Sequence, residues 1–590
     1  MRSCWVVRGL VLAALTVGLQ GSTFAADGPK STEVWEGKLK IGTGATVRIV
    51  FNVEKEGDRA VRATFDSPDQ NAKGLKVDEV TINAKQVVFD MAGLGMKYTG
   101  ARKDGGKEAV GQWEQGGVSL PLTLTQAAKA SADPDAIVGK EQVWEGPLEV
   151  NAGLKLRIVI HVGKNAAGTL VATFDSPDQG TKGVKLDSVS LDKTAFTFEL
   201  KIAKGKYEGT LNKDGTEAVG TWTQGGTPMP LTLKKADKPT ALNRPQTPKP
   251  PFPYVAEEVS YPNEAGKVTI AGTLTKPSGK GPFPAVILIS GSGSQDRDET
   301  LFEHKPFLVL ADALTKRGVA VLRVDDRGVG GSTGDATKST TEDFAGDVLA
   351  GVAYLKSRPD VDAAKIGLMG HSEGGVIAPM VATKSDDVAF LVLLAGTGLP
   401  GRDILQLQAR AIGKAMSKAK DDTALESQLA LQTMLIDVVV GEPDTARADA
   451  KMAAALEQWK AGIPDEAKQE ITKVDAAIKG QFKQLNSPWF RYFLTYDPRP
   501  TLRQVKVPVL ALIGEKDLQV LPRENLSEIA KALKARGTGS TRIVELTGLN
   551  HLFQTSKTGA PSEYVEIEET IAPAALTEIV GWVTRVTGTN

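Results

Sequence analysis

Gly370-His371-Ser372-Glu373-Gly374-Gly375 places a serine between small residues, directly after the short apolar run at residues 366–369. A serine on a sharp turn from a strand into a helix projects its hydroxyl outward, and flanking glycines let the turn close without a side-chain clash. The spacing alone is weak in a chain with 61 glycines, so the strand before it and the helix after it give most of the specificity. The pattern predicts nucleophilic attack by Ser372, the chemistry of a serine hydrolase.

A serine hydroxyl needs a general base, and the base needs an acid that fixes its tautomer. Of the four histidines, His551 is the best base because it follows an expected strand at residues 542–546. Asp517 follows an expected strand at residues 507–513 and is the predicted acid. The order Ser372, Asp517, His551 matches the chain order of α/β-hydrolase triads.

The other candidates for these two roles are weaker. Glu515 is the rival acid, but Asp517 lies farther along the loop and has more room to turn back toward the histidine. His371 adjoins the serine and is expected to pack beneath the turn, and His161 is expected to have a packing or surface role in a strand. His304 follows the first sheet loop and is a predicted substrate-binding residue.

Acyl transfer also needs backbone amides aimed at the developing oxyanion. One predicted donor is the amide of Glu373, directly after the serine. The other is the amide of Ser292 or Gly293 in the small-residue loop at 290–294, and the sequence does not decide between them. This loop lacks the G-x-G-x-x-G spacing and the Gly-Lys-Ser/Thr of nucleotide sites, which argues against phosphate binding.

Two further clusters have both a structural and a functional interpretation. Charged residues at 325–327 and 296–298 are expected to form ion pairs that brace the loops, although contact with substrate is an alternative. Trp489 and Phe490 end a helical region; core packing is the default, and a contribution to an apolar acyl pocket is the sharper prediction.

From residue 254 onward, apolar runs alternate with helical stretches, a pattern typical of a mostly parallel sheet covered by helices. The expected strands lie at residues 285–289, 320–324, 366–369, 390–394, 507–513 and 542–546. Between about residues 402 and 485 the pattern changes to long, charged, amphipathic stretches, which predict a helical cap inserted above the sheet. The predicted α/β-hydrolase domain with its cap therefore spans residues 254–590.

The first half of the chain contains an internal repeat. Val34-Trp35-Glu36-Gly37 returns as Val143-Trp144-Glu145-Gly146, and Trp113 returns as Trp222, which defines two copies at about residues 31–127 and 140–236. Alternating runs separated by Asp-Gly and Ser-Pro-Asp turns predict that each copy is a small antiparallel β-sandwich or barrel. Some residues that the copies share could form a ligand groove or a calcium site. Core aromatics and turn-forming carboxylates are the stronger interpretation for these residues, which are Trp113/Trp222, Tyr98/Tyr207 and Asp66/Asp175.

The remaining segments have simpler interpretations. Residues 1–25 have the basic start, apolar core and small residues of a signal peptide, so the protein is expected to be exported, periplasmic or secreted. Cys4 is the only cysteine and lies in this segment, so disulfides, thiolate catalysis and cysteine-based zinc sites are excluded from the mature chain. Residues 237–253 are rich in proline and predict an extended linker, a semi-rigid spacer or a segment lying along the next domain.

The 71 basic and 71 acidic residues balance, which gives no electrostatic reason to bind nucleic acid, and no window after the signal is long and apolar enough for a membrane span. Oligomeric state cannot be predicted from these patterns.

Several motifs in order extend the inference beyond the serine turn. Over roughly residues 245–590 the chain resembles the EstD-type bacterial esterases of the α/β-hydrolase superfamily. The resemblance rests on Ser290-Gly291-Ser292-Gly293-Ser294-Gln295-Asp296-Arg297-Asp298, His304-Lys305-Pro306-Phe307, Asp325-Asp326-Arg327-Gly328, Gly370-His371-Ser372-Glu373-Gly374-Gly375, Ser487-Pro488-Trp489-Phe490, Gly514-Glu515-Lys516-Asp517 and Asn550-His551-Leu552-Phe553.

The resemblance implies carboxylic ester hydrolysis through Ser372, Asp517 and His551 without a metal or organic cofactor, on small or medium acyl esters. Members often carry one β-rich N-terminal module, and this chain looks like one with two. Ser294 stands where the family often has proline, which leaves the backbone donor in place. The alternatives are a serine peptidase of the related aminopeptidase-like branch, and a binding protein whose β-modules hold an envelope polysaccharide beside an accessory hydrolase.

Overall fold

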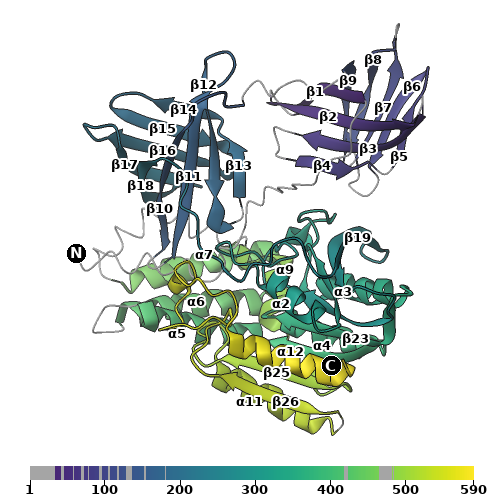
Figure 1. Ribbon diagram of the computed structural model, residues 1–590. Helices are drawn as coiled ribbons and strands as arrows, with labels where there is room; N and C mark the ends of the chain where they lie inside the picture. Colours follow the sequence, from purple (N-terminus) through teal and green to yellow (C-terminus); the bar gives the residue numbers. More distant parts are fainter. Residues whose placement is uncertain are drawn as a thin grey trace.

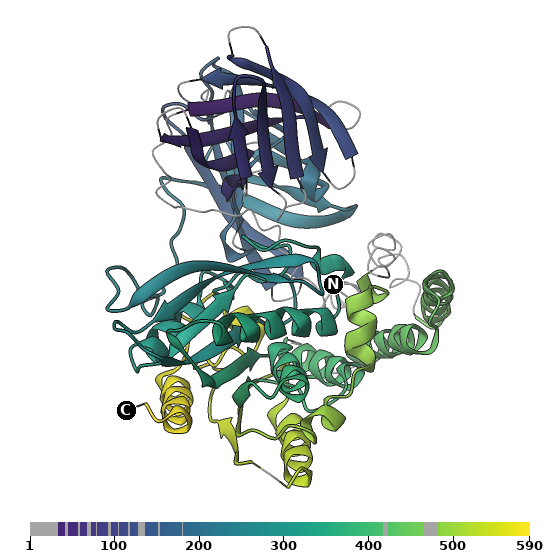
Figure 2. The same cartoon turned by 90° about the vertical axis from the view of Figure 1, so that its right-hand side faces the viewer.

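The computed structural model describes residues 33–41, 45–56, 59–67, 72–77, 79–91, 96–103, 106–115, 118–127, 136–151, 154–179, 181–416, 423–463, 482, 484–537 and 539–589. The predicted signal peptide lies outside the described residues, as does part of the predicted cap. The described chain contains two nine-stranded sheets and one eight-stranded sheet. Figure 1 shows the first two sheets as separate bodies above the third, and in the turned view of Figure 2 the first two overlap and again lie above the third.

The first sheet, called module 1 here, is antiparallel and follows the order β4-β3-β2-β1-β9-β8-β7-β6-β5. Its alternating strands turn one row of side chains inward, where Trp35, Phe51 and Trp113 share a single apolar core. Its strands are β1 (Glu33–Ile41), β2 (Ala45–Glu56), β3 (Arg59–Ser67), β4 (Ala72–Lys76), β5 (Glu79–Ile82), β6 (Gln86–Met91), β7 (Met96–Arg102), β8 (Glu108–Gln115) and β9 (Val118–Ala127).

The second sheet, module 2, has the same order, β13-β12-β11-β10-β18-β17-β16-β15-β14. Tyr207 pairs with Trp222 as Tyr98 pairs with Trp113 in module 1, so the two copies also share a register. Its strands are β10 (Gln142–Asn151), β11 (Leu154–Lys164), β12 (Leu170–Ser176), β13 (Thr181–Lys185), β14 (Ser188–Leu191), β15 (Ala195–Leu200), β16 (Gly205–Leu211), β17 (Glu217–Gln224) and β18 (Thr227–Ala236), with short 3-10 turns η3 (Pro177–Gln179) and η4 (Lys201–Ala203).

The residues that the modules share have structural roles in module 2. Tyr207 and Trp222 are almost fully buried in the core, and the Tyr207 hydroxyl donates to the Ala218 carbonyl at 3.0 Å. Asp175 accepts from the amide of Gly183 at 2.6 Å and contacts Nε2 of His161 at 3.1 Å. A filled aromatic core and a turn-forming carboxylate agree with the structural interpretation of the repeat rather than with a ligand groove.

The third sheet has the order β19-β20-β22-β21-β23-β24-β25-β26, antiparallel at the β19 edge and parallel from β22 onward. The predicted architecture of antiparallel β-modules followed by an α/β-hydrolase domain is thereby confirmed. The strands are β19 (Val255–Asn263), β20 (Val268–Lys276), β21 (Phe283–Ile289), β22 (Ala320–Val324), β23 (Val361–His371), β24 (Val388–Leu394), β25 (Val509–Gly514) and β26 (Thr541–Leu546).

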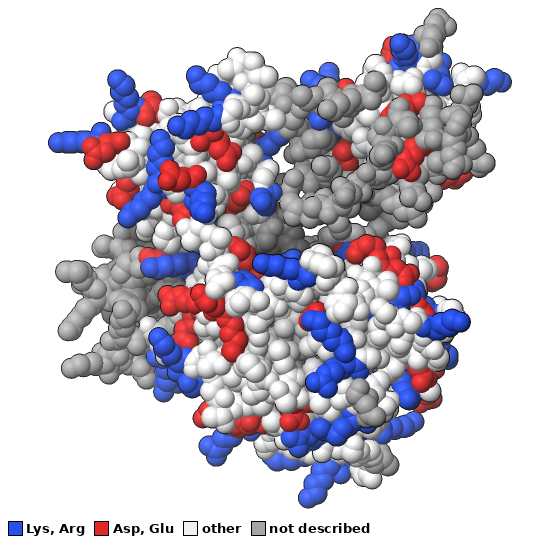
Figure 3. Space-filling view, in the orientation of Figure 1, with Lys and Arg blue, Asp and Glu red and all other residues white. Residues whose placement is uncertain are grey.

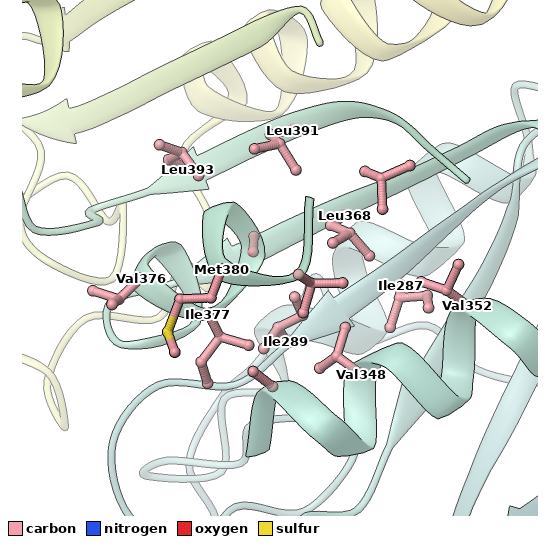
Figure 4. Packing of buried hydrophobic residues seen from close by; sticks show 14 of the residues in the cluster. Ile287, Ile289, Val348, Val352, Leu368, Val376, Ile377, Met380, Leu391 and Leu393 are labelled. Carbon is pink, nitrogen blue, oxygen red and sulfur yellow. The ribbon is translucent and has the colours of Figure 1, made fainter. Parts of the chain in front are cut away.

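Helices cover both faces of this sheet because its central strands are apolar on both sides. In β21, Ile287 and Ile289 face one core, while Val286 and Leu288 face the other. Figure 4 shows the first core, where Leu368 of β23 lies among side chains from the sheet and two helices. The helices of the two layers are α2 (Pro306–Thr315), α3 (Thr341–Lys356), α4 (Gly374–Lys384), α10 (Pro498–Leu502), α11 (Pro522–Ala535) and α12 (Pro573–Thr587), with 3-10 turns η5 (Ala336–Lys338) and η6 (Pro561–Glu563).

A helical region between β24 and β25 forms its own core, in the place where the sequence predicted a cap. Leu405, Leu431, Trp459 and Phe490 belong to this cluster and come from different helices. These helices are α5 (Gly401–Met416), α6 (Thr423–Gly441), α7 (Thr445–Ala461) and α9 (Pro488–Thr495). In Figure 2 they gather at one side of the hydrolase domain.

The proline-rich segment lies along the hydrolase domain. Arg244 donates to the carbonyls of Phe302, Val565 and Ile567 at 2.8–3.0 Å. Gln246 donates to the Ile571 carbonyl at 2.7 Å. Both side chains therefore join the segment to residues more than 50 positions later in the chain.

Both signs of charge are spread over the same surfaces of module 2 and the hydrolase domain in Figure 3, in keeping with the balanced composition. Within the described part of the chain, no helix has the length and apolar character needed to cross a membrane.

Candidate active site

Ser372 occupies a strained turn between β23 and α4. Its φ of 52° lies in the left-handed region, which costs a non-glycine residue on the order of 1–3 kcal/mol and persists only where the surroundings hold it. The turn is held by tight packing: a Cβ on Gly370 would lie 1.9 Å from the Gly374 carbonyl oxygen, and one on Gly374 would lie 2.2 Å from that of Ile289. The two glycines are therefore required by contact, and the turn has the geometry of a nucleophile elbow.

His551 and Asp517 are brought together from the ends of two neighbouring strands. Nδ1 of His551 lies 2.7 Å from Oδ2 of Asp517. The other carboxylate oxygen accepts from the amides of Gln519 and Val520, both at 2.8 Å. Asp517 is 1% exposed, so this carboxylate is fixed in a buried position and orients the imidazole with its proton on Nδ1.

The histidine is anchored directly beside the elbow. His371, the residue before Ser372, lies with Nε2 3.1 Å from the His551 carbonyl oxygen, and the two imidazole rings are 4.9 Å apart. Nδ1 of His371 is 2.9 Å from Oε1 of Glu299. Burial, the largest single influence, lowers the pKa of His371, but the Glu299 carboxylate, the His551 carbonyl and Asp517 together raise it, so the net pKa lies above its usual value. His371 thus packs beneath the turn, as expected.

Glu515, the rival acid, has a different role. Its Oε2 accepts from the amide of Gly548 at 2.7 Å, across the turn that leads out of β26. The contact ties together the two loops that carry Asp517 and His551. Of the two acids considered, the contact with the histidine is made by Asp517.

The loop after β21 is held by two carboxylates, the buried one of Glu299 and the partly buried one of Asp326. The amide of Gly291 donates to Oε1 of Glu299 at 2.8 Å. Asp326 accepts from the Ser290 hydroxyl at 2.6 Å and from the Gln295 amide at 2.8 Å. Burial raises the pKa of Asp326 to about 8, because the ionised form loses its hydration there.

The same loop lies close enough to Ser372 for its backbone amides to reach an oxyanion formed there. A Cβ on Gly291 would meet Cβ of Ser372 at 3.3 Å. Because the Gly291 amide is already bound to Glu299, the amides of Ser292 and Gly293 remain the candidates for the second oxyanion donor. Gly293 has a φ of 101°, a conformation that favours glycine.

Glu373 combines a predicted backbone role with a buried side chain. Its carboxylate accepts from the Thr341 hydroxyl at 2.7 Å and from Nε1 of Trp489 at 2.8 Å. Burial raises the pKa of Glu373, and the hydrogen bonds from Thr341, Trp489 and Ser292 oppose that rise. The side chain connects the elbow to cap helix α9, so the cap and the nucleophile are held by one residue.

The predicted substrate-binding residues are in different environments. Phe490 is 1% exposed in the cap core, which agrees with core packing, the default interpretation, and its part in an acyl pocket stays a prediction. Trp489 stacks on Phe493 and donates to Glu373. His304 is buried with Nδ1 2.9 Å from the Thr570 hydroxyl, and burial lowers its pKa to about 4. Its part in substrate binding stays a prediction.

The charged clusters mostly form the expected ion pairs. Arg297 bonds Asp325 at 2.7 Å and also pairs with Glu258. Arg327 bonds Asp347 at 2.7 Å inside the domain. Among the described residues, no group of three or more histidine, cysteine or acidic side chains is placed to hold a metal ion.

The side chains of Glu299 and Glu373 were not predicted as parts of the site, and Asp326 was expected to brace its loop through an ion pair. Glu299 meets His371 72 positions away, so no local pattern pointed to it, and Asp326 bonds the uncharged Ser290 36 positions away rather than an ion-pair partner. The available signal was indirect, namely acidic residues in the loops that follow β21, β22 and β23.

The comparisons with known proteins agree with this geometry. A family model described as Serine aminopeptidase, S33 matches residues 305–554, a range that contains Ser372, Asp517 and His551. The chain is 25% identical to esterase EstD of Thermotoga maritima over 399 residues, which is 66% of this chain and 79% of that protein. The resemblance that the motifs predicted is thereby confirmed.

Shorter or more distant similarities were also found. The chain is 31% identical to hydrolase YtaP of Bacillus subtilis over 129 residues, 19% of this chain and 43% of that protein. Among solved structures, esterase Pf2001 of Pyrococcus furiosus has a TM-score of 0.35 at 16% identity and covers 59% of this chain and 98% of its own. Est1E of Butyrivibrio proteoclasticus, solved with ferulic acid, has a TM-score of 0.32 at 16% identity, with 55% and 96% covered.

Proposed function

We propose that this protein is a carboxylic ester hydrolase with Ser372, Asp517 and His551 as its catalytic triad. The proposal is supported by an α/β-hydrolase domain that is similar in sequence to a known esterase. One observation carries the proposal. The 2.7 Å contact between Asp517 and His551 is anchored, through His371, beside a serine in the left-handed conformation. These are the parts that acyl transfer by a serine requires.

In the proposed reaction, the Ser372 hydroxyl attacks the ester carbonyl while His551 takes its proton. Asp517 holds Nδ1–H, which leaves Nε2 to act as the base. The negative charge on the carbonyl oxygen is stabilised by the amide of Glu373 and by that of Ser292 or Gly293. His551 then protonates the departing alcohol, and water resolves the acyl-enzyme by the same steps in reverse order.

The test is hydrolysis of p-nitrophenyl acetate, butyrate, octanoate and palmitate by the protein and by Ser372→Ala. We expect turnover of the shorter esters and a loss of at least about a thousandfold in kcat for the variant. A fluorophosphonate probe should label the protein once, at Ser372, as read by mass spectrometry. Ester turnover that survives in a folded Ser372→Ala protein would reject the proposal.

A second candidate function is peptide hydrolysis, favoured by the description of the family model that matches residues 305–554. The same triad cleaves amides when the site holds an amino terminus. Aminoacyl-anilides measured beside the esters separate the two activities. Faster cleavage of the anilides than of the esters, by kcat/KM, would favour the peptidase.

Export is a further part of the proposal, and it rests on the signal-like pattern of residues 1–25. Expression of the full chain in a bacterial host with a periplasm should give a mature protein that begins at Ala26. Amino-terminal sequencing of the periplasmic fraction checks this. A protein that keeps residues 1–25 in the cytoplasm would contradict it.

A further inference from the structure

Arg157 makes one of the contacts between module 2 and the hydrolase domain. Arg157 lies on β11, and its Nη2 is 2.6 Å from Oε1 of Glu303 in the hydrolase domain. The same guanidinium bonds Asp178 of module 2 and the Thr240 carbonyl of the linker, each at 2.8 Å. The side chain of Arg157 is 16% exposed and that of Glu303 is 37% exposed, so the multiply bonded guanidinium is mostly buried and its pair with Glu303 is partly shielded from solvent.

Glu303 belongs to a loop with unusual backbone geometry. Glu299, Phe302 and Glu303 have φ values of 52°, 49° and 60°, the left-handed region that non-glycine residues avoid. A segment with three such residues keeps its shape only where neighbours hold it. Module 2 and the linker supply these neighbours: the Phe302 amide donates to the Asp178 carbonyl at 3.2 Å, and its carbonyl accepts from Arg244 at 2.9 Å.

The other end of this loop holds the catalytic loop. Oε1 of Glu299 accepts the Gly291 amide at 2.8 Å and lies 2.9 Å from Nδ1 of His371. Gly291 precedes the two candidate oxyanion donors, and His371 precedes the nucleophile. Five consecutive residues, 299–303, therefore connect the contact with module 2 to both sides of the proposed catalytic centre.

We propose that module 2 is a positioning element of the active site, and that Arg157 is the positioning residue that sets the 290–294 loop through Glu303 and Glu299. The inference rests on the proposed esterase function. Arg157 touches no substrate; its effect is on the placement of the amides that meet the oxyanion. Its loss should therefore weaken stabilisation of the transition state and leave ground-state binding of the ester almost unchanged.

The repeat supplies a matched control. Arg48 occupies in module 1 the position that Arg157 occupies in module 2, within Arg48-Ile49-Val50 and Arg157-Ile158-Val159. The variants Arg157→Ala and Arg48→Ala remove the same group from the same place in two copies of one fold. Only the first removes the partner of Glu303, so the comparison separates the interdomain contact from a general cost to the β-module.

The experiment measures p-nitrophenyl butyrate kinetics for the full-length mature protein and its variants. For Arg157→Ala we expect kcat to fall about tenfold to a hundredfold with KM changed less than twofold, since a displaced oxyanion loop costs somewhat less than a deleted donor. Affinity for a trifluoromethyl ketone, which forms an oxyanion adduct, should fall by the same factor. Arg157→Lys should recover part of the loss, and Arg48→Ala should match the unaltered protein.

Glu303→Gln tests the contact from the hydrolase side, in case Arg157→Ala disturbs module 2. Glu303→Gln should lower kcat and leave KM unchanged. The variant with both substitutions should be no less active than Arg157→Ala, because the two changes break the same contact. Hydrogen exchange gives a readout independent of catalysis. Peptides covering residues 290–304 should exchange faster in Arg157→Ala than in Arg48→Ala.

Several outcomes would overturn the inference: unchanged kcat and loop exchange in Arg157→Ala, equal losses in both arginine variants, or additive effects of Arg157→Ala and Glu303→Gln. Failure of the proposed function looks different. If the unaltered protein hydrolyses no ester, the esterase is rejected, while loop exchange still decides whether module 2 orders residues 290–304.

Discussion

At the residue scale, the sequence predicted the groups that follow strand ends and missed the groups that meet across loops. Ser372, Asp517 and His551 could be named because parallel strands end at one edge of a sheet, where their loops converge. Glu299 could not, because its partner is set by how loops fold back on one another. Asp326 was expected to form an ion pair, but its partners are the uncharged Ser290 and Gln295. For Phe490 both interpretations were open, since an aromatic residue near a site looks the same in sequence whether it faces the core or the pocket.

Asp517→Asn tests the acid directly. An amide keeps the shape of the side chain but has no negative charge to hold the proton on Nδ1 of His551. The wrong histidine tautomer then lowers kcat by about ten-thousandfold in triads of this kind. The measurement is kcat for p-nitrophenyl butyrate at pH 7.5. Glu515→Gln is the matched control, because the glutamine oxygen can still accept from the Gly548 amide and kcat should change little. Equal losses in the two variants would contradict the assignment of Asp517.

Asp326 predicts a dependence of stability on pH. Burial raises the pKa of Asp326 to about 8, whereas an unfolded aspartate has a pKa of about 3.9. Between these values the folded protein keeps a proton that the unfolded chain releases, so stability falls as the pH rises from 4 to 8, by at most about 1.4 kcal/mol per pH unit. Below pH 4 both states hold the proton and no stability is lost. Above pH 8 neither state holds it, and the loss stays constant.

The variant Asp326→Asn lacks the titrating proton. The apparent Tm of the hydrolase transition, followed by calorimetry at pH 5 and pH 7.5, should therefore drop less in Asp326→Asn than in the unaltered protein. Groups that titrate in both proteins cancel in this comparison. Parallel Tm profiles would show that Asp326 does not carry the raised pKa.

At the scale of elements, the alternation of apolar runs was enough to place the sheet and its covering helices. The expected strand at residues 320–324 coincides with β22, and that at residues 542–546 lies within β26. Strand ends were less predictable. β23 begins at Val361, before the apolar run at 366–369, because Val361 pairs with Phe283 of β21, while the exposed residues 363–365 that follow hide this start from an apolar pattern.

The close contacts of the elbow predict the effect of one methyl group. In Gly370→Ala the new Cβ would lie 1.9 Å from the Gly374 carbonyl oxygen, so the turn must open. We expect a loss of at least about a hundredfold in kcat/KM, since misplacement of a nucleophile by about 1 Å has effects of this size. Gly441→Ala is the control, because its Cβ would meet nothing within 4 Å. Near-normal activity of Gly370→Ala would mean that the turn is not constrained as described.

At the scale of the whole molecule, the sequence predicted the number and kind of domains but not how they meet. Composition marks residues 237–253 as extended, yet the bonds of Arg244 to Phe302 and Val565 depend on surfaces that form only when the domains are complete. The repeat likewise predicted two similar folds and gave no sign that the second copy alone bonds Glu303 through an arginine.

Module 1 has a self-contained core, from which a deletion experiment follows. Its buried cluster draws only on residues between Trp35 and Leu124. A shortened protein that begins at residue 136 should keep kcat and KM for p-nitrophenyl butyrate within about twofold, because module 2 and its contact with Glu303 remain. Circular dichroism verifies folding. A tenfold fall in kcat would place module 1, too, among the elements that support the site.

The linker contacts bear on the order in which the chain can assemble during synthesis. Arg244 and Gln246 bond residues 321–325 positions later, close to the carboxyl terminus. The modules are made first and can fold early, as domains generally do on the ribosome. The surface that binds the linker is incomplete until residues 565–571 have emerged, so these contacts form only when synthesis of the chain is nearly finished. A ribosome-stalled fragment that ends before residue 565 would contain two folded modules and a hydrolase domain that lacks the linker-binding surface.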